Sequence, residues 1–472
     1  MPGGNVPPLV LPSFRGKSMI DGKRAESRKP SSVLATFRLL VGALFSFEAI
    51  FALYLYSNAL KFIHPFPFPV DETLVFAAMA VPVGMFIVLR RGIYQPALQL
   101  LAPILIFFGW ALVTWTWSPS RIIAKQYVMD YITLDLFSMI AAGFVIAPSR
   151  DRIVRFLLCS AFFAMIISVY GIWLSINYGP IMFYKGFDFS GRAYLLWSYG
   201  AAFGAMVLFA ITIFSRFLSG KQLVGGAFFG ICAYFVLISG SRGALLGFGL
   251  GCLLLLLGSG RLWEGRRLRV TTSQIIAFFV LLLAVGYIGW MVVEGIASQS
   301  IGRFVKLFRQ AEDDSVILTA NRFDYYAFAV KAWLDAPIFG NGLGSFSILY
   351  RNMERYGAQP HNAFLEILAE YGLVGMVLFL LVLGSLFNRI RKAGVLRDPV
   401  MLTLLAMFAV QFANAMVARQ LSGQMGLFAM FGLLTAAPAL ARRTTSSRFP
   451  SGGNALIAAR TARSPFWIRW QA

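Results

Sequence analysis

The sequence contains few charged residues, few cysteines and few histidines. Charged residues make up 13% of the 472 residues, hydrophobic residues make up 58%, and the mean hydropathy is +0.71. Ordinary globular chains carry about a quarter charged residues, so a soluble domain is excluded. The 3 cysteines, Cys159, Cys232 and Cys252, lie inside apolar segments without metal-type spacing. A disulfide framework and a cysteine metal site are therefore not expected.

The sequence also lacks the motifs of nucleotide chemistry. It has no phosphate-binding Gly-x-x-x-x-Gly-Lys loop, no dinucleotide fingerprint and no nucleophilic serine elbow. We therefore predict no cofactor. The net charge of +22 does not indicate a nucleic-acid partner, because the basic residues fall mainly in short loops between apolar segments, where they set membrane topology.

Apolar stretches of about 18 or more residues recur along the chain, and each can cross a bilayer. We predict an all-α polytopic membrane protein with about twelve transmembrane helices. The predicted spans cover residues 35–58, 72–89, 97–117, 126–147, 154–176, 193–215, 222–240, 243–258, 274–294, 362–387, 398–418 and 423–440.

The loops between these spans are basic on alternate sides, as at Arg90–Arg91 and Arg266–Arg267. By the positive-inside rule both termini are predicted to be cytoplasmic. The predicted organisation has five parts: a disordered basic arm (1–34), helices one to nine (35–294), a large periplasmic loop (295–361), helices ten to twelve (362–441) and a cytoplasmic tail (442–472).

The large loop has its own predicted structure. Asn321–Ala336 has helical spacing and ends before Pro337, and the Gly-rich stretch 340–344 is a predicted turn. A second short helix is predicted over Ile348–Arg355. The apolar stripe of the first helix consists of Phe323, Ala327, Val330 and Leu334.

His361 is the main candidate for a catalytic residue. It is one of only 2 histidines, and it lies where the chain re-enters the membrane from the large loop. If Pro360 is in the first turn of the tenth span, His361 lies within that helix's N-terminal turn. The positive end of the helix dipole then disfavours the imidazolium, and a neutral imidazole can accept a proton as a general base. The alternative is a structural histidine at the membrane interface, which is how we interpret His64.

Three arginines are candidates for binding a phosphate group on the outer side. Arg242 lies in the small-residue turn Ser239–Gly243, Arg192 lies at the outer end of the sixth span, and Arg322 opens the loop helix. Guanidinium groups bind phosphate oxygens in bidentate fashion. A single arginine at a membrane end is more often an interfacial anchor, but three on one side favour an anion site.

Acidic residues offer a weaker case for a metal site. Glu312–Asp314 and Asp71–Glu72 could supply oxygen ligands. The cluster of three and the pair both lie in loops, however, and we predict no metal site.

Three segments together resemble one known family. SGSRGALLGFGLG (239–251), NRFDYYAFAVKAWLDAPIFGNGLGSF (321–346) and PHNAFLEILAEYGLVG (360–375) are similar to the O-antigen ligase/polymerase family of bacterial membrane glycosyltransferases. The resemblance covers roughly Arg192 to Gly375. The segment after Arg192 lacks the Asn-Pro-Asn-like stretch that the family pattern would have there.

The resemblance implies a C-type glycosyltransferase-like fold in the bacterial inner membrane, with the active site on the periplasmic face. It implies a donor glycan on undecaprenyl pyrophosphate, held among membrane lipids, and a glycan or a lipid A core as acceptor. It also implies that His361 is the catalytic residue, and that Arg242, Arg192 and Arg322 bind the pyrophosphate without a metal.

Two questions stay open at the level of sequence. The acceptor distinguishes a polymerase, an O-antigen ligase and a protein ligase, and we lean slightly toward a polymerase because no feature is dedicated to a lipid A core. A lipid-linked oligosaccharide transporter is the non-enzymatic alternative. A transporter usually has acids near mid-membrane, whereas acids within the spans, such as Glu48, Asp130 and Asp135, are few.

Overall fold

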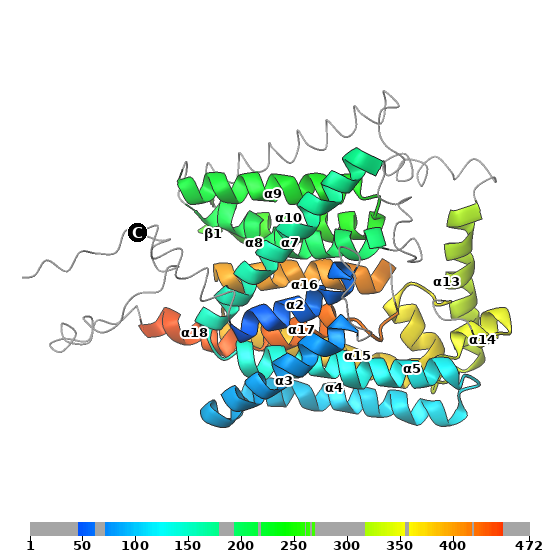
Figure 1. The fold of residues 1–472 in the computed structure, drawn as a ribbon. Coiled ribbons are helices and arrows are strands. Elements are labelled where there is room, and N and C mark those ends of the chain that lie inside the picture. Colours follow the sequence, from blue (N-terminus) through cyan, green and yellow to red (C-terminus); the bar gives the residue numbers. More distant parts are fainter. Residues whose placement is uncertain are drawn as a thin grey trace, which may run out of the picture. The chain divides into compact units, whose positions relative to one another are not determined.

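The computed structural model describes residues 46–61, 71–178, 193–215, 219–259, 261–264, 267–269, 317–354, 358–417 and 420–446. All of them belong to one compact unit, Ala43–Ala472, and nearly all are helical (Figure 1). The strands described within these ranges form one short antiparallel hairpin, β1 (Arg261–Glu264) and β2 (Arg267–Arg269).

Nine helices in these ranges are long and apolar enough to span a membrane. They are α3 (Glu72–Arg91), α4 (Gln95–Thr114) with η1 (Trp115–Trp117), the run from α5 (Ile122–Asp130) through η2 (Tyr131–Leu136) and α6 (Phe137–Ile140) to η3 (Ala141–Ile146), α7 (Arg150–Tyr178), α8 (Ala193–Phe214), α9 (Gly220–Ile238), α10 (Arg242–Ser259), α15 (Ala363–Ala393) and α16 (Pro399–Val417).

Nine of the twelve predicted spans correspond to these helices, so the chain is a helical polytopic membrane protein. Of the first predicted span the structure describes only α2 (Phe47–Leu60). The ninth, 274–294, lies outside the described residues, as do the basic arm and most of the tail. The twelfth is divided into α17 (Met425–Leu434), which is too short to span, and α18 (Ala437–Ser446).

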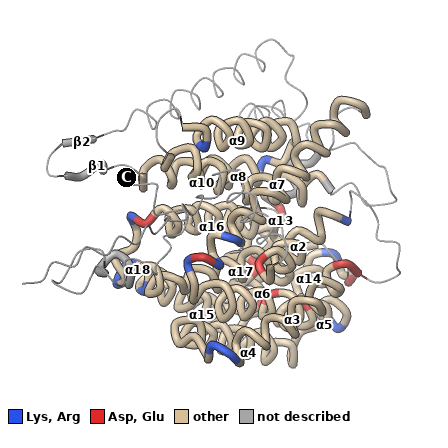
Figure 2. Tube along the Cα trace, turned by 60° about the vertical axis from the view of Figure 1, so that its left-hand side comes forward, with Lys and Arg blue, Asp and Glu red and all other residues tan. Residues whose placement is uncertain are grey.

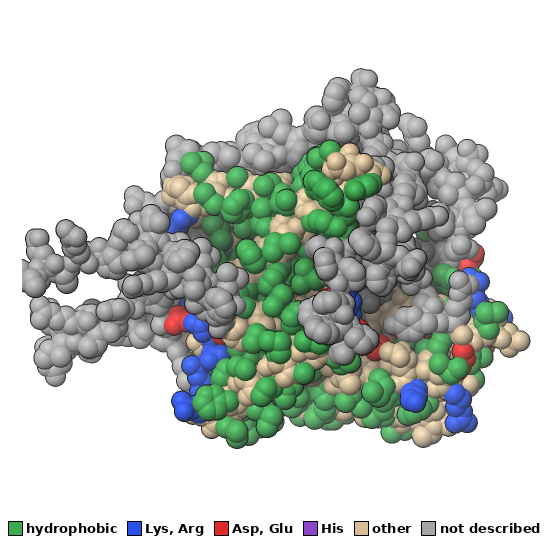
Figure 3. Space-filling view, in the orientation of Figure 1, with side chains coloured by type: hydrophobic (Ala, Val, Ile, Leu, Met, Phe, Trp, Pro, Cys, Tyr) green, Lys and Arg blue, Asp and Glu red, His purple; other side chains and the backbone are tan. Residues whose placement is uncertain are grey.

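Large apolar side chains cover the outside of the helices. On α3, for example, Leu89 is 80% exposed and Met85 is 60% exposed. Figure 3 shows hydrophobic side chains over the middle of the visible face, with Lys and Arg near its two ends. Such a surface is unfavourable in water and favourable against lipid.

One end of the bundle carries ion pairs between helix starts. The buried carboxylate of Glu48 on α2 lies 3.1 Å from an Arg152 nitrogen and 3.3 Å from an Arg155 nitrogen, and Arg150 lies 2.6 Å from Asp398 at the start of α16. We call this the basic end; the charged residues of the tube in Figure 2 lie mostly near helix ends. A buried carboxylate needs such partners, because leaving a buried charge unpaired is strongly destabilising.

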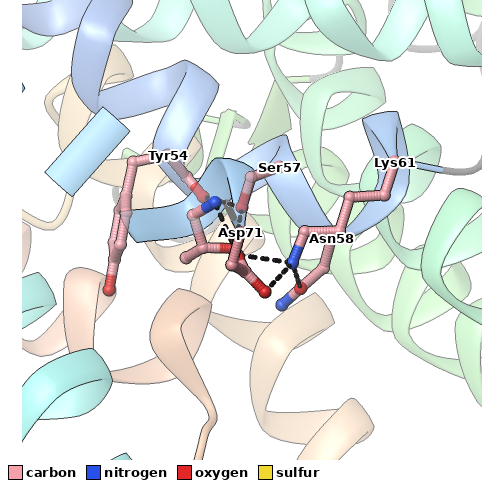
Figure 4. A network of polar contacts seen from close by, with 6 residues as sticks. Tyr54, Ser57, Asn58, Lys61 and Asp71 are labelled. Carbon is pink, nitrogen blue, oxygen red and sulfur yellow. Dashed lines mark hydrogen bonds and ion pairs between the residues drawn. The ribbon is translucent and has the colours of Figure 1, made fainter. Parts of the chain in front are cut away.

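At the opposite end of α2 a polar network joins α2 to α3 (Figure 4). The Lys61 ammonium donates to both Asp71 carboxylate oxygens at 2.7 Å, and Asp71 accepts from the backbone N–H of Thr73 at 2.7 Å. The carboxylate of Asp71 thus caps α3 and pairs with a cation. Glu312–Asp314 lies outside the described residues.

The loop region between α10 and α15 contributes two helices, α13 (Ile317–Asp335) and α14 (Phe346–Arg351). Both short helices predicted for the loop are therefore present, the second one shorter than predicted. In Figure 1 α13 runs across the direction of the spans, with α14 beside it, at the end away from β1 and α18. We call this the loop end.

Candidate active site

The four predicted site residues differ in how far the structure describes them. Arg192 lies outside the described residues, and of Arg322 only its place in α13 is described. Arg242 is the first residue of α10, and His361 lies two residues before α15 begins. The geometry of the site therefore comes from Arg242, His361 and their neighbours.

The starts of α10 and α15 lie at the same end of the bundle. α10 and α16 are antiparallel, because a Cβ on Gly243 would collide with Val417, and one on Gly258 would collide with Leu402. Four residues after Val417, the backbone N–H of Leu421 donates to the Glu366 carboxylate at 3.1 and 3.2 Å. Glu366 is in the first turn of α15, so Arg242 and His361 are both at the loop end.

His361 has an unusual backbone conformation. Its φ is +56°, in the left-handed region that few residues other than glycine, asparagine, aspartate and histidine adopt. Asn362 follows as the N-cap of α15, and its side-chain oxygen accepts from the N–H groups of Phe364 at 3.0 Å and Leu365 at 3.1 Å. The prediction that Pro360 starts the helix, with His361 in its first turn, is wrong. The helix begins after Asn362 because asparagine is among the best N-caps.

Among the described residues, Gln359 and Tyr325 have side chains close to the His361 ring. The Nε2 atom of Gln359 is 3.5 Å from His361 Nδ1, and the ring of Tyr325 on α13 has its centroid 6.0 Å away. The Tyr325 hydroxyl in turn accepts from the guanidinium of Arg351 at 3.0 Å. Tyr325 also contacts the rings of Phe346 and Tyr350 on α14. The aromatic contacts between α13 and α14 thus form one wall beside His361.

The glycine-rich turn packs directly on α15. Gly340, Gly342 and Gly344 all have positive φ. The N–H groups of Asn341 and Gly342 donate to the carbonyls of Ala369 at 3.0 Å and Glu370 at 2.9 Å. The turn prediction for 340–344 is confirmed, and its contacts show that the turn fastens the loop to the helix that follows His361.

The turn fills a break in α15 at Gly372. This residue has φ +66° and ψ −164°, and the chain there leaves the helical conformation. The N–H of Leu373 donates to the Pro337 carbonyl at 2.9 Å, and the indole of Trp110 on α4 donates to the Tyr371 carbonyl at 3.0 Å. Backbone groups freed by a break inside a membrane helix need such partners, since lipid supplies none.

Two buried carboxylates on α15 were missed by the sequence reading, which found Glu48, Asp130 and Asp135 within the spans. Glu366 and Glu370 are 0% and 1% exposed. Glu370 accepts from the N–H groups of Gly344 at 2.8 Å and Phe346 at 3.4 Å, and Glu366 accepts from Leu421. The available signal was two glutamates spaced by four residues inside an apolar segment, the first of them four residues after Asn362. Each one anchors a different loop at the loop end.

The apolar stripe predicted on the loop helix lies on its exposed side. Phe323 is 67% exposed and Leu334 is 63% exposed. The packed side consists instead of Ala329 and Ala332, which contact Phe346 and Ala369. Beyond the end of α13 a hollow of about 450 Å³ is lined by Trp117 and residues 336–340. Its lining is apolar and contains no charged side chain, so it is not suited to hold a phosphate group.

The comparisons with known proteins bear on the segment that contains these features. Residues 227–380 match the family model described as O-antigen ligase. These residues belong to the O-antigen ligase family. The matched segment includes Arg242, Arg322 and His361, whereas Arg192 lies before it. No curated protein matches the chain. The family indicates a membrane enzyme that transfers glycans, which is the general class that the sequence resemblance implied.

Proposed function

We propose that the protein transfers a glycan from undecaprenyl pyrophosphate to an acceptor hydroxyl at the periplasmic face of the bacterial inner membrane. The observation that carries this proposal is the common location of Arg242 and His361 at the loop end, within the O-antigen ligase segment. A cation and an imidazole on one side of the bilayer suit a reaction that needs both an anion site and a base.

In the proposed reaction the acceptor oxygen attacks the anomeric carbon of the donor sugar. The bond from that carbon to the pyrophosphate oxygen breaks, the new glycosidic bond forms, and His361 takes the hydroxyl proton. Arg242, with Arg192 and Arg322, balances the negative charge that grows on the leaving pyrophosphate. Direct displacement inverts the configuration at the anomeric carbon.

The acceptor defines the finer function, and our slight preference for a polymerase over an O-antigen ligase rests on sequence alone. The test is transfer by the purified protein from a defined lipid-pyrophosphate glycan, with EDTA present and absent. A second lipid-linked repeat unit, a lipid A core and a protein are offered in turn as acceptors. Elongation of the lipid-linked glycan identifies a polymerase, and transfer to lipid A core identifies a ligase. Absence of transfer to all three acceptors by the folded protein contradicts the proposal.

Arg242→Lys tests the pyrophosphate site directly. Lysine keeps the charge but loses the planar fork that binds two phosphate oxygens. We expect a higher KM for the lipid-linked donor, by on the order of tenfold for about 1.4 kcal/mol of lost binding. Arg389→Lys is the matched control, because Arg389 is near the end of α15 at the basic end, where it donates to Gln99. An unchanged donor KM in Arg242→Lys removes this arginine from the site.

A further inference from the structure

The turn before α15 brings the side chain of Gln359 back to the ring of His361. Pro360 fixes its own φ and holds the residue before it extended, and His361 itself is left-handed with φ +56°. The amide nitrogen Nε2 of Gln359 thereby comes within 3.5 Å of His361 Nδ1. Gln359 is only 4% exposed, although it lies in a loop.

The other amide atom, Oε1 of Gln359, is buried and has no hydrogen-bond partner among the described residues. A buried carbonyl oxygen without a partner is costly. The oxygen and nitrogen of a glutamine amide have nearly the same size, so their assignment follows from the hydrogen bonds that each can make. Turning the Gln359 amide over places Oε1 beside Nδ1 and gives this oxygen a donor.

The two orientations have opposite consequences for His361. If the amide nitrogen faces the ring, it donates to Nδ1, and the proton of the neutral imidazole is on Nε2. If the amide oxygen faces the ring, Nδ1–H of His361 donates to it, and Nε2 of His361 carries the lone pair that accepts a proton. Only the second orientation leaves a base at the far side of the ring, held in position by a buried neighbour, as in other base–orienter pairs.

We propose that Gln359 is a positioning residue for His361. The Oε1 atom of Gln359 accepts a hydrogen bond from Nδ1–H of His361, and the Nε2 atom of His361 serves as the base. This inference rests on the proposed function, in which His361 takes the acceptor proton. Among the described residues, the ring of Tyr325 on α13 lies beside the imidazole, and the Tyr325 hydroxyl accepts from Arg351 on α14. On α15 itself Glu366 is turned toward Leu421.

The test uses the fact that the chain has only 2 histidines. In a His64→Asn background, the pH dependence of carbethoxylation by diethyl pyrocarbonate reports the pKa of His361 alone and needs no enzymatic activity. In Gln359→Leu the acceptor for Nδ1–H is lost, so the imidazolium loses a stabilising contact and the midpoint should move to lower pH. In Gln359→Glu a carboxylate faces the ring, and the midpoint should move to higher pH by about 1–3 units.

The sign of the shift in Gln359→Leu decides between the two amide orientations. A donor facing Nδ1 stabilises the neutral ring, so its removal would move the midpoint to higher pH and overturn the proposal. A midpoint that is unchanged in both variants also overturns it. Gln411→Leu is the matched control, a buried glutamine on α16, and it should leave the midpoint in place.

Transfer kinetics separate positioning from binding. For Gln359→Leu we expect kcat to fall by on the order of tenfold, which corresponds to one lost hydrogen bond, with an unchanged donor KM. The acid limb of kcat should follow the carbethoxylation midpoint. If wild-type protein transfers no glycan, the proposed function fails, but the midpoint shifts still report whether Gln359 orients His361. An unchanged kcat in folded Gln359→Leu overturns the positioning role.

Discussion

The left-handed conformation of His361 affects how its role can be tested. This conformation costs residues with a Cβ about 1–2 kcal/mol in steric strain, and asparagine and histidine tolerate it better than alanine. Replacement by alanine therefore mixes a loss of chemistry with a loss of backbone stability. Asparagine removes the basic nitrogen and keeps a side chain that is compatible with φ +56°.

For His361→Asn we expect glycan transfer to fall by about 10²–10⁴, the typical contribution of a general base. The apparent melting temperature in detergent should match that of the wild type. Initial transfer rates of the purified proteins are the measurement. A wild-type rate in the folded variant would show that the base lies elsewhere.

Glu354 is a second residue whose environment decides its chemistry. It follows α14, and its carboxylate accepts from the Ser120 hydroxyl at 2.9 Å and the Ile122 N–H at 3.1 Å, at the start of α5. Slight burial raises the pKa of Glu354, but hydrogen bonds from the Arg121 N–H, the Ser120 hydroxyl and the Ile122 N–H outweigh it. The net result is a pKa below its ordinary value of 4.5.

Glu354→Gln should therefore change the pH dependence of stability. A carboxyl group with a lowered pKa in the folded state contributes stability above its ordinary pKa, and this contribution is lost as the pH falls through the folded-state value. The wild type should melt above Glu354→Gln at neutral pH, and the difference should shrink below pH 4.5. Asp335→Asn, at an exposed position on α13, is the control. A difference that does not depend on pH would contradict the capping role.

At the scale of elements, the break in α15 ties the large loop to the membrane helices. The carbonyls of Ala369 and Glu370 and the N–H groups of Leu373 and Val374 all bond to residues 337–342. Gly372 allows this arrangement because its backbone conformation is open to glycine and strongly strained for other residues. The loop thus replaces the helical hydrogen bonds that the break removes, in the same helix that follows His361.

Gly372→Ala should destabilise the protein by about 1–3 kcal/mol, the cost of a strained backbone conformation. A Cβ at Gly372 would also collide with the carbonyl of Ile338. Gly384→Ala is the matched control in the same helix, because a Cβ there meets nothing within 4 Å. It should be neutral or stabilising by up to about 1 kcal/mol. Apparent melting temperatures in detergent measure the loss of stability. Equal shifts in the two variants would contradict the role of Gly372 in joining the loop to α15.

At the scale of the whole molecule, the two ends of the bundle differ in chemistry. The basic end holds the ion pairs of Glu48 and Asp398. The loop end holds His361, Arg242 and the carboxylates of Glu366 and Glu370, which face backbone N–H groups. The positive-inside rule predicts that the basic end faces the cytoplasm. The proposed reaction, at the loop end, then takes place on the periplasmic side of the membrane.

Single cysteines test this orientation. The native Cys159, Cys232 and Cys252 are buried, and they can be replaced to give a background without thiols. Leu396→Cys, between α15 and α16, and Met353→Cys, after α14, are at exposed positions. An impermeant maleimide applied from the periplasm should label residue 353 and should label residue 396 only after the inner membrane is permeabilised. Labelling of both from one side would contradict the topology.

The sequence by itself determined the membrane class, nine of the spans and the short helices of the loop. These features depend on hydropathy and spacing within a single segment, so each segment contains its own evidence. The sequence also placed Arg242 and His361 on one side, because the alternation of spans requires it, and three motifs in order were enough to indicate the family.

Only the tertiary structure decided how the loop end is held together. Glu370 bonds to Gly344 and Glu366 bonds to Leu421, 26 and 55 residues away, and hydropathy carries no information on partners so distant in the chain. The break at Gly372 depends on the turn that packs against it, and the apolar sequence around Gly372 does not indicate a break. The contact of Gln359 with His361 required the left-handed turn, since a helical start would have pointed the two side chains apart.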